Sequence, residues 1–268
     1  RSVLRIKYQY NRSFAIQDFC LYKDLDYVEV KVRIDWREPG TQLKIKYPVN
    51  LNFRKPTYEI PYGYIEKSAN GEEEPGQSWF DFTGEHFKKS VMYGLTIANN
   101  AKYSYNMDVD EMNLTVLKNS VYAHHDPKVL EEDMEYRYVD DGIQEFTYAL
   151  IPHEGSWKDA KVTEHAREIN VRPQAIIETF HKGKLPARQS FVSLDCDHAL
   201  ISAIKESEDK DGIIIRAWET KKQSGKAVLK IPVMDREAEL SFGPCEIKTI
   251  KIPYDHSKPV TEVNLLEL

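Results

Sequence analysis

The chain has 268 residues, of which 41% are hydrophobic and 11% aromatic, a composition typical of globular proteins and not of disordered ones. Its 37 basic and 43 acidic residues give a net charge of −6 without a basic stripe, which argues against a nucleic-acid partner because phosphate binding needs clustered Lys and Arg. No apolar run reaches the roughly 20 residues that a membrane-spanning helix needs, so we expect no membrane partner.

Alternation of apolar and polar residues predicts antiparallel strands, starting with LRIKYQY at 4–10. In VEVKVRIDW at 28–36, the Val, Ile and Trp side chains share one parity and the charged side chains share the other, which is typical of a strand with one wet face. Trp36 is therefore expected in the core. The pattern recurs in LKIKYPVNL at 43–51, MNLTVL at 112–117 and EFTYALI at 145–151. Many short strands of this kind indicate a β-sandwich or a related large β-sheet fold.

One helix is expected in the first part of the chain. Ser156 and Asp159 match a capping box, in which an acid lies three residues after a serine. A helix beginning there would turn one face inward and end near Asn170, because Pro173 prevents further helical growth. The residues of that face are Ala160, Thr163, Ala166 and Ile169.

The segment HKGKLPARQ at 181–189 has the composition of a linker, since it is basic and interrupted by glycine and proline. We therefore divide the chain into a large β-domain, 1–185, and a small antiparallel β-sandwich, 186–268, both within the usual size range of domains. Trp218 ends one apolar run of the second part and is expected in the core. The strand patterns of this part are GIIIRAW at 212–218, KAVLKIPV at 226–233 and EIKTIKIP at 246–253.

Motifs for metal or nucleotide chemistry are missing from the sequence. His124-His125 is the one adjacent pair of histidines, and no HxH, HExxH or Cys/His cluster occurs, so we expect no zinc site made by this chain alone. Neither a G-x-S-x-G elbow nor a Gly-rich phosphate loop occurs, which argues against serine hydrolases and nucleotide-binding proteins. Cys20, Cys196 and Cys245 lie far apart without CxxC spacing, which predicts buried thiols in a reducing compartment such as the cytoplasm.

The stretch YEIPYGYIEKSANGEEEPGQSW at 58–79 places tyrosines and a tryptophan beside carboxylates, as a sugar-binding surface would. Trp79 could stack on the apolar face of a pyranose, or it could close the core as a lid. Glu72, Glu73 and Glu74 are consecutive on an expected loop, and such a charge run is usually a solvated tip. Glycoside hydrolysis would need two carboxylates on either side of the scissile bond.

The second candidate is the run Asp140-Asp141-Gly142-Ile143-Gln144-Glu145, which leads into an apolar strand. Binding residues are commonly presented at such a strand mouth. Alternatively, the run is a turn in which an aspartate caps the backbone and Gly142 supplies a positive φ.

Four phrases, taken in order, resemble the C-terminal β-region of α-mannosidases of glycoside hydrolase family 38, and most of all its bacterial and cytosolic branch. They are RIDWREPGTQLKIKYP, YEIPYGYIEKSANGEEEPGQSWFDFTGE, NNAKYSYNMDVDEMNLTVLKNSVY and DDGIQEFTYALIPHEGSW. The resemblance implies an all-β chain with a galactose-mutarotase-like β-supersandwich over 1–185 and a smaller sandwich after it. The chain starts without Met and already in a strand pattern, so we expect it to be the C-terminal part of a longer enzyme.

In that family, retaining exo-α-mannosidases carry their nucleophilic aspartate, general acid and zinc ion in an N-terminal domain. The family's N-terminal barrel motifs are not found here, and the one HxD run, His124-His125-Asp126, lies between two of the phrases that resemble the C-terminal β-region. The resemblance therefore implies a non-catalytic scaffold and cleft wall, with no catalytic residue and no metal ligand in this chain. Its partners would be the N-terminal catalytic domain and a mannose-containing oligosaccharide, and a homo-oligomer is a further option. The candidates for the cleft wall are Tyr62, Gly63, Glu74, Gln77, Trp79, Asp140, Asp141, Gln144 and Glu145.

The sequence leaves two alternatives to the mannosidase portion. The first is a stand-alone, non-catalytic carbohydrate-binding or assembly module. The second is a sugar epimerase, which would need a histidine facing a carboxylate. His153 and Glu145 do not suit that role, because eight residues of one strand separate them by roughly 26 Å. The sequence also departs from the family pattern at Ser104, Lys118 and Gln144, and the last change weakens any claim of essential chemistry there.

Overall fold

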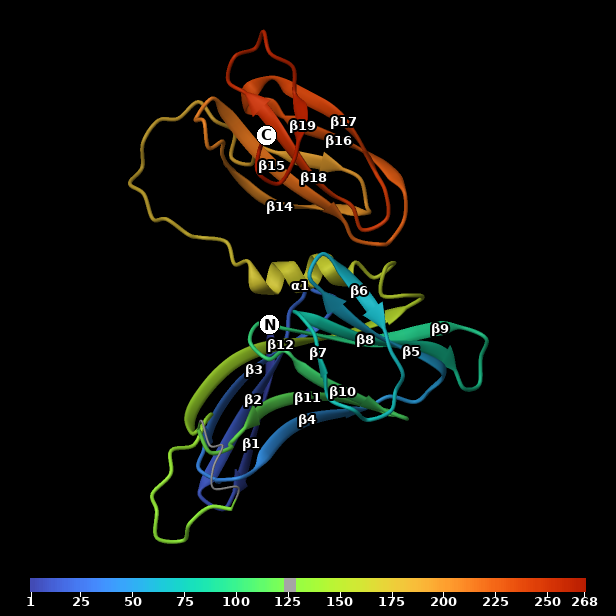
Figure 1. Cartoon of the computed structure of the whole chain (residues 1–268), viewed down its shortest axis with the longest axis vertical. Coiled ribbons are helices and arrows are strands. Elements are labelled where there is room, and N and C mark those ends of the chain that lie inside the picture. The colour runs from blue at the N-terminus through green and yellow to red at the C-terminus, as the bar shows by residue number, and fades with distance from the viewer. Residues whose placement is uncertain (123–128) are drawn as a thin grey trace. The chain divides into compact units, whose positions relative to one another are not determined.

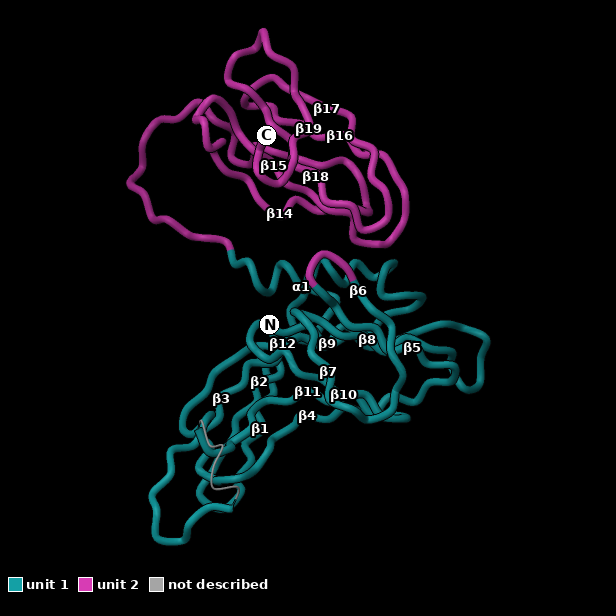
Figure 2. Tube along the Cα trace, viewed as in Figure 1, with its two compact units in different colours: residues 1–60, 64–172 teal, residues 61–63, 173–268 magenta. Residues whose placement is uncertain are grey.

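The computed structural model describes residues 1–122 and 129–268, which we call the described residues, and the His124-His125 pair lies outside them. The chain divides into two compact units, each treated by itself (Figure 2). Unit 1 contains residues 1–60 and 64–172, and unit 2 contains residues 61–63 and 173–268. Nearly all regular structure is β-strand (Figure 1), so the predicted all-β class, with a large sandwich and then a small antiparallel one, is confirmed.

Unit 1 is built on two sheets. The larger has the strand order β1-β2-β3-β12-β9-β8-β5-β6, and the smaller has the order β4-β11-β10-β7. The strands of the larger sheet are β1 (Ser2–Tyr10), β2 (Ser13–Leu21), β3 (Val28–Trp36), β12 (Gly142–Glu154), β9 (Met92–Asn99), β8 (Trp79–His86), β5 (Leu51–Ile60) and β6 (Gly63–Glu66). The strands of the smaller sheet are β4 (Gln42–Pro48), β11 (Glu111–Lys118), β10 (Ser104–Asp108) and β7 (Glu74–Pro75).

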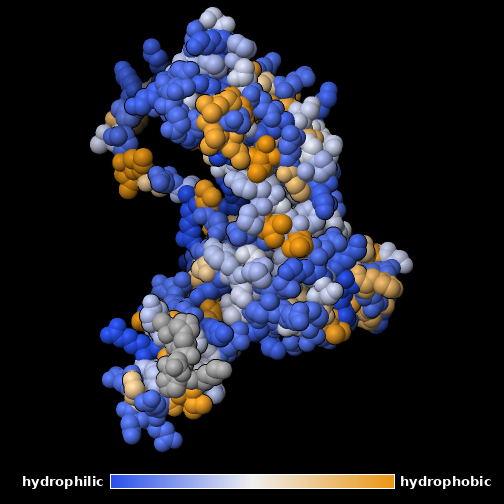
Figure 3. Space-filling view, in the orientation of Figure 1, coloured by the Kyte–Doolittle hydropathy of each residue, from blue (hydrophilic) through white to orange (hydrophobic). Residues whose placement is uncertain are grey.

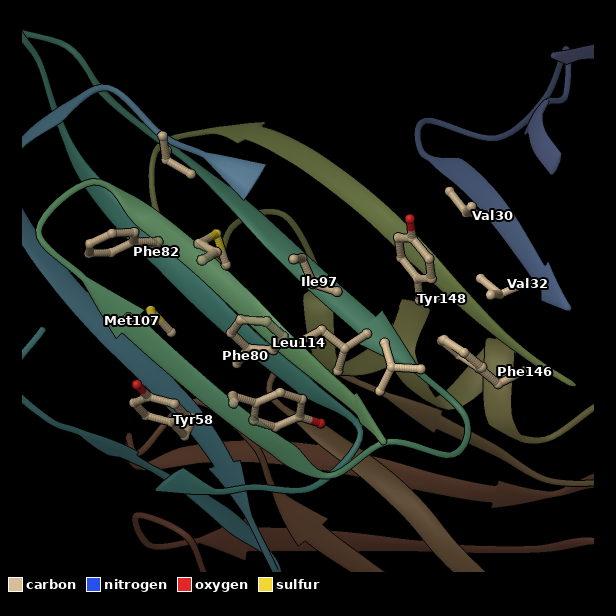
Figure 4. Close-up of a cluster of buried hydrophobic side chains, with 14 of the residues drawn as sticks. Val30, Val32, Tyr58, Phe80, Phe82, Ile97, Met107, Leu114, Phe146 and Tyr148 are labelled. Carbon is tan, nitrogen blue, oxygen red and sulfur yellow. The ribbon is translucent and has the colours of Figure 1, made fainter. Parts of the chain in front are cut away.

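The core of unit 1 joins the inner faces of these two sheets (Figure 4). Alternation along a strand puts every second side chain on one face, so Phe80 and Phe82 of β8 both enter the core. Leu114 of β11 meets them from the smaller sheet. Trp36 is 6% exposed at the end of β3, which confirms the prediction that it belongs to the core.

The opposite face of the larger sheet is covered in part by α1 (Val162–Asn170), which packs on β8 and β9. Thr163, Ala166 and Ile169 are buried in it, which confirms three residues of the predicted inner face, whereas Ala160 precedes the helix and is half-buried. Among the described residues, no helix has both the length and the apolar character needed to cross a membrane.

The start of α1 differs from the prediction. Ser156 Oγ does donate to Asp159 Oδ2 at 2.8 Å, but this pair closes a turn that precedes the helix. Lys161, immediately before the first helical residue, is left-handed with φ 52° and ψ 39°. A left-handed residue cannot continue a right-handed helix, so the turn and α1 are separate and the predicted capping box was wrong.

Unit 2 is a small sandwich whose core includes Ile215, Leu229 and Ile250. Trp218 is 8% exposed, which confirms its predicted burial. Residues 173–192 precede the first strand of this unit and form no helix or strand. One sheet contains β13 (Ser193–Asp195), β16 (Gly225–Ile231) and β17 (Arg236–Phe242), and the other contains β14 (Ala199–Glu206), β15 (Gly212–Glu219), β18 (Ile247–Pro253) and β19 (Thr261–Val263). A short 3-10 helix (Pro232–Met234) joins β16 to β17.

Part of the surface of unit 2 is hydrophobic, as the orange side chains in Figure 3 show. The exposed apolar residues nearest the C-terminus are Leu265, Leu266 and Leu268. The Cys196 side chain packs against the core of this unit, while Cys20 is buried in unit 1. Burial of all three thiols was predicted, but Cys196 and Cys245 are only half-buried.

Candidate functional site

The turn that leads into β8 is held by Glu59, a residue of β5 that the sequence did not single out. The backbone N–H of Ser78 donates to Glu59 Oε2 at 2.6 Å, and the Ser78 hydroxyl donates to the same oxygen. The backbone N–H of Gln77 donates to the Glu59 carbonyl at 3.0 Å. Behind the turn, a Cβ on Gly76 would lie 2.4 Å from the Tyr105 ring, so this position has no room for a larger side chain. The turn is therefore fixed in place before any ligand arrives.

Burial raises the pKa of the Glu59 carboxyl, and the hydrogen bonds from Ser78 oppose that effect in part. Because the folded pKa lies above the unfolded value, the folded chain holds more protons between the two values, and stability falls as the pH rises through that window. We predict that Glu59→Gln gains stability relative to the wild type as the pH rises from below the unfolded pKa to neutrality. Urea unfolding at acidic and neutral pH measures this difference.

Asp18 supplies a control of opposite sign for Glu59. A hydrogen bond from Arg5 lowers the pKa of Asp18, so the stability that Asp18 contributes is present above its unfolded pKa and is lost as the pH falls through its folded pKa. Asp18→Asn should therefore lose stability relative to the wild type as the pH rises. If both variants follow the same trend with pH, the assignment to Glu59 is wrong.

The predicted candidates between 62 and 79 have different degrees of exposure. Tyr62 is 43% exposed at a turn with φ 56°, and Gly63 is buried at the start of β6. Gln77 is exposed, while Glu74 is half-buried and paired with a lysine of the same segment. Trp79 is 1% exposed and its ring centroid lies 4.7 Å from that of Trp157. In this chain Trp79 therefore has the position of the core lid, with no free ring face.

The run of three glutamates was predicted to be a solvated tip, but the Glu73 side chain is held by hydrogen bonds. Ser104 Oγ donates to Glu73 Oε1 at 2.6 Å, and Lys44 and Thr115 donate to the same carboxylate. Ser104 is one of the positions that depart from the family pattern, and this hydrogen bond gives it a local role. The glutamate therefore ties β10 to β11 and β4 and is not the tip of a free loop.

The candidates from 140 to 145 form a compact turn at the start of β12. Asp140 and Gly142 both have positive φ, at 58° and 95°, and Asp140 Oδ2 accepts from the backbone N–H of Lys118 at 3.1 Å. These features agree with the second interpretation of this run, a turn in which an aspartate caps the backbone and Gly142 has a positive φ. Gln144 Nε2 donates to the Asp140 carbonyl at 3.0 Å. Asp141 is exposed near Arg37, with 3.8 Å between their charged atoms, and Glu145 forms an ion pair with an arginine of β3.

The two groups of candidates do not meet in one monosaccharide-sized site. Trp79 pairs with Ala98 of β9, and Ala98 pairs with Ala149 of β12. Gln144 precedes Ala149 by five residues, which is about 17 Å along the strand, and β9 lies between β8 and β12. Only an extended ligand, or a second domain, could contact both groups at once.

The loop between β9 and β10 connects the two groups. Lys102 Nζ donates to Gln144 Oε1 at 2.5 Å and lies 5.5 Å from the centroid of the Phe146 ring. Burial lowers the pKa of Lys102. The Tyr103 carbonyl of the same loop accepts a hydrogen bond from the backbone N–H of Gly76 at 3.1 Å. Sequence reasoning missed Lys102, because no local pattern in the loop indicates that its side chain turns inward.

A histidine does face a carboxylate in unit 1, although not the pair considered from sequence. His153 Nε2 lies 2.8 Å from Asp81 Oδ1, and their side chains are 3% and 0% exposed. An imidazole beside a carboxylate is typical of acid–base catalysis, but a catalytic base must reach the proton of its substrate. This pair is closed off from solvent and serves as a polar contact within the fold.

The described residues hold no cluster of three or more His, Cys, Asp and Glu side chains that could bind a metal ion. The carboxylates of the two candidate groups are engaged with lysine, arginine or backbone partners, as Glu74, Asp140 and Glu145 illustrate. The arrangement can position loops and present polar groups, and its geometry does not assemble an opposed pair of acids.

Residues 1–128 match the family model described as the glycosyl hydrolases family 38 C-terminal domain. The chain is 24% identical over 201 residues to "Alpha-mannosidase G" of Dictyostelium discoideum, covering 72% of this chain and 17% of that protein. It is 27% identical over 162 residues to "Alpha-mannosidase 2C1" of Mus musculus, covering 58% of this chain and 14% of that protein. The chain thus spans less than a fifth of the length of these relatives.

A crystal structure of a glycosyl hydrolase family 38 protein from Enterococcus faecalis has the same fold. Its TM-score to this chain is 0.70 at 15% identity, and the match covers 89% of this chain and 29% of that one. Both units of the chain therefore have a structural counterpart within a much longer protein.

Proposed function

We propose that the chain, whose residues 1–128 match the model of the glycosyl hydrolases family 38 C-terminal domain, is the non-catalytic C-terminal portion of a retaining α-mannosidase. The observation that supports this proposal is the match of residues 1–128 to that domain, together with α-mannosidase relatives of which it spans less than a fifth. The parent enzyme would remove terminal α-linked mannose from oligosaccharides through a mannosyl-enzyme intermediate. Zinc in its N-terminal catalytic domain would orient the sugar hydroxyls.

Within that enzyme the chain supports the catalytic domain and contributes a wall of the substrate cleft. The exposed candidates, Tyr62, Gln77, Asp140, Asp141 and Glu145, are the ones that could touch a glycan. The buried Trp79 would hold the shape of the wall from behind. The domain division at 185/186 and a cytoplasmic location are further parts of this proposal, the latter supported by three cysteines that no disulfide joins.

We predict that the purified 268-residue chain does not hydrolyse p-nitrophenyl α-mannoside, with or without added zinc. The reason is that its described residues supply neither a metal cluster nor an opposed pair of acids. A matched positive control is the product of the coding sequence extended upstream into a catalytic domain, which should show zinc-dependent turnover. Zinc-dependent turnover by the 268-residue chain itself would contradict the proposal, as would an upstream sequence without such a domain.

A further inference from the structure

A groove of about 690 Å³ opens in unit 1 between β1–β3 of the larger sheet and β4 of the smaller one. It opens there because β1 and β4 are edge strands, so the two sheets are not closed on this side. The volume lies within the ~300–1,000 Å³ range of small-molecule sites. Residues of β1 that should belong to the core by alternation are instead exposed, including Leu4 at 62%.

Aromatic rings form one wall of this groove. Tyr8 is 49% exposed and Tyr10 is 58% exposed, and both line the groove. The Tyr10 ring stacks on the buried Trp36 ring, with 6.1 Å between centroids and 7° between planes. The Trp36 indole N–H donates to Thr41 Oγ1 at 2.9 Å, so the support under Tyr10 is itself held in place. Neither Tyr8 nor Tyr10 uses its hydroxyl in a hydrogen bond with a described residue, and each ring offers a face to a ligand.

The floor of the groove carries neutral polar groups. Gln17, which is 8% exposed, donates through Nε2 to the hydroxyl of the buried Tyr148 at 3.0 Å. The hydroxyls of Tyr47 and Tyr148 lie 2.6 Å apart. Burial raises the pKa of Tyr47, so its phenol stays neutral at physiological pH. Gln17 Oε1 has no partner among the described residues and remains able to accept from a ligand hydroxyl.

The charged residues that line the groove are both neutralised by partners. They are Lys44, which pairs with Glu73, and Lys46, whose Nζ lies 3.0 Å from a carboxylate oxygen of Glu111. Among the described residues, no carboxylate lines the groove. A ligand with a phosphate or carboxylate would therefore find no free cation here, whereas a neutral ligand with ring faces and hydroxyls would find both kinds of contact.

We propose that this groove binds a short neutral oligosaccharide, which stacks its rings on Tyr8 and Tyr10 and hydrogen-bonds Gln17 and Tyr47. Sugar rings have apolar faces that pack on aromatic side chains and hydroxyl edges that suit amide and phenol groups. The inference rests on the geometry of the groove and does not require the chain to be part of a mannosidase. It concerns binding alone, since the lining residues that the structure describes include no acid for glycoside cleavage.

The test is calorimetric titration of the purified 268-residue chain with mannotriose, cellotriose and maltotriose at millimolar concentration. We expect at least one of them to bind, and an oligogalacturonate of equal length to bind more weakly because the groove offers no free cation. Tyr8→Ala should weaken binding by about tenfold, whereas Tyr8→Phe, which keeps the ring, should retain most of it. Tyr254→Ala is the matched control, because Tyr254 is 48% exposed in unit 2.

Three outcomes would overturn the proposal: no binding of any trisaccharide by a folded wild-type chain, equal losses for Tyr8→Ala and Tyr254→Ala, or preferred binding of the acidic sugar. Sedimentation should be run on the same samples. A dimer that Tyr8→Ala dissociates would mean that the groove holds a second copy of the chain and not a glycan. Circular dichroism of Tyr8→Ala checks that the exposed edge strand tolerates the change.

Discussion

Replacement of Asp81 by alanine is expected to lower the free energy of unfolding of unit 1 by about 3–5 kcal/mol. The Asp81 side chain is 0% exposed. Its carboxylate accepts hydrogen bonds from Thr83 Oγ1 at 2.5 Å and Thr96 Oγ1 at 2.7 Å, and it lies 2.8 Å from His153 Nε2. The substitution removes all three contacts and leaves a void. His153 Nδ1 already lacks a partner in the described residues, so the imidazole would be buried with neither nitrogen satisfied.

Urea unfolding monitored by circular dichroism measures this loss. The matched control is Asp18→Ala, which removes a carboxylate from an exposed pair with Arg5 and should cost no more than about 1 kcal/mol. If Asp81→Ala costs no more than that control, the buried network contributes little and the reasoning fails.

Combining Asp81→Ala with His153→Ala tests whether the two residues act as a pair. Because each single change leaves the other partner buried without its contact, the double variant should lose less stability than the two single losses added together. Simple additivity would show that the two residues stabilise the fold independently.

This network also illustrates what the sequence could not predict. Asp81 and His153 meet because Asp81 pairs with Thr96 while His153 pairs with Gly94, two residues away on the same strand. Such a contact depends on the registers of three strands, and no local pattern encodes those registers. Only His153 entered the sequence argument, and it was compared with Glu145 on its own strand.

Strand periodicity, in contrast, predicted much of the fold. The run at 28–36 became β3 with Val30, Val32, Ile34 and Trp36 buried and Val28 half-buried, because alternation reports directly which face a strand turns inward. Alternation does not report whether anything covers that face. The first strand has the same pattern, yet Tyr8 and Tyr10 are exposed because β1 is an edge strand beyond the reach of the smaller sheet.

The candidate site was predictable only in part. Gly142 at the start of β12 has the positive φ that the sequence suggested, because a glycine before an apolar strand is a strong local signal. Glu59 forms hydrogen bonds with Gln77 and Ser78, and Ser78 lies 19 residues further along the chain. No sequence pattern around Glu59 indicates that contact. The positioning residues were therefore missed where their partners lie far away in sequence.

Replacement of Trp79 by alanine is expected to cost about 3–5 kcal/mol of stability, in the range measured for large aromatic residues in protein cores. Trp79 belongs to the cluster between the outer face of the larger sheet and α1, together with Trp157 and Ala166. The truncation would leave a cavity under the helix that neighbouring side chains cannot fill. Trp79→Phe should lose less, because it restores most of the buried ring.

Thermal melting of the 268-residue chain measures the effect, with Tyr103→Ala, an aromatic residue 50% exposed on a neighbouring loop, as the control. In the longer enzyme that we propose, Trp79→Ala would then act through disorder of the cleft wall, and the fall in stability would accompany any rise in KM. A raised KM with an unchanged melting temperature would contradict this account. Such a result would mean that the Trp79 ring contacts the substrate directly, and the ring would then have to leave its buried position under α1.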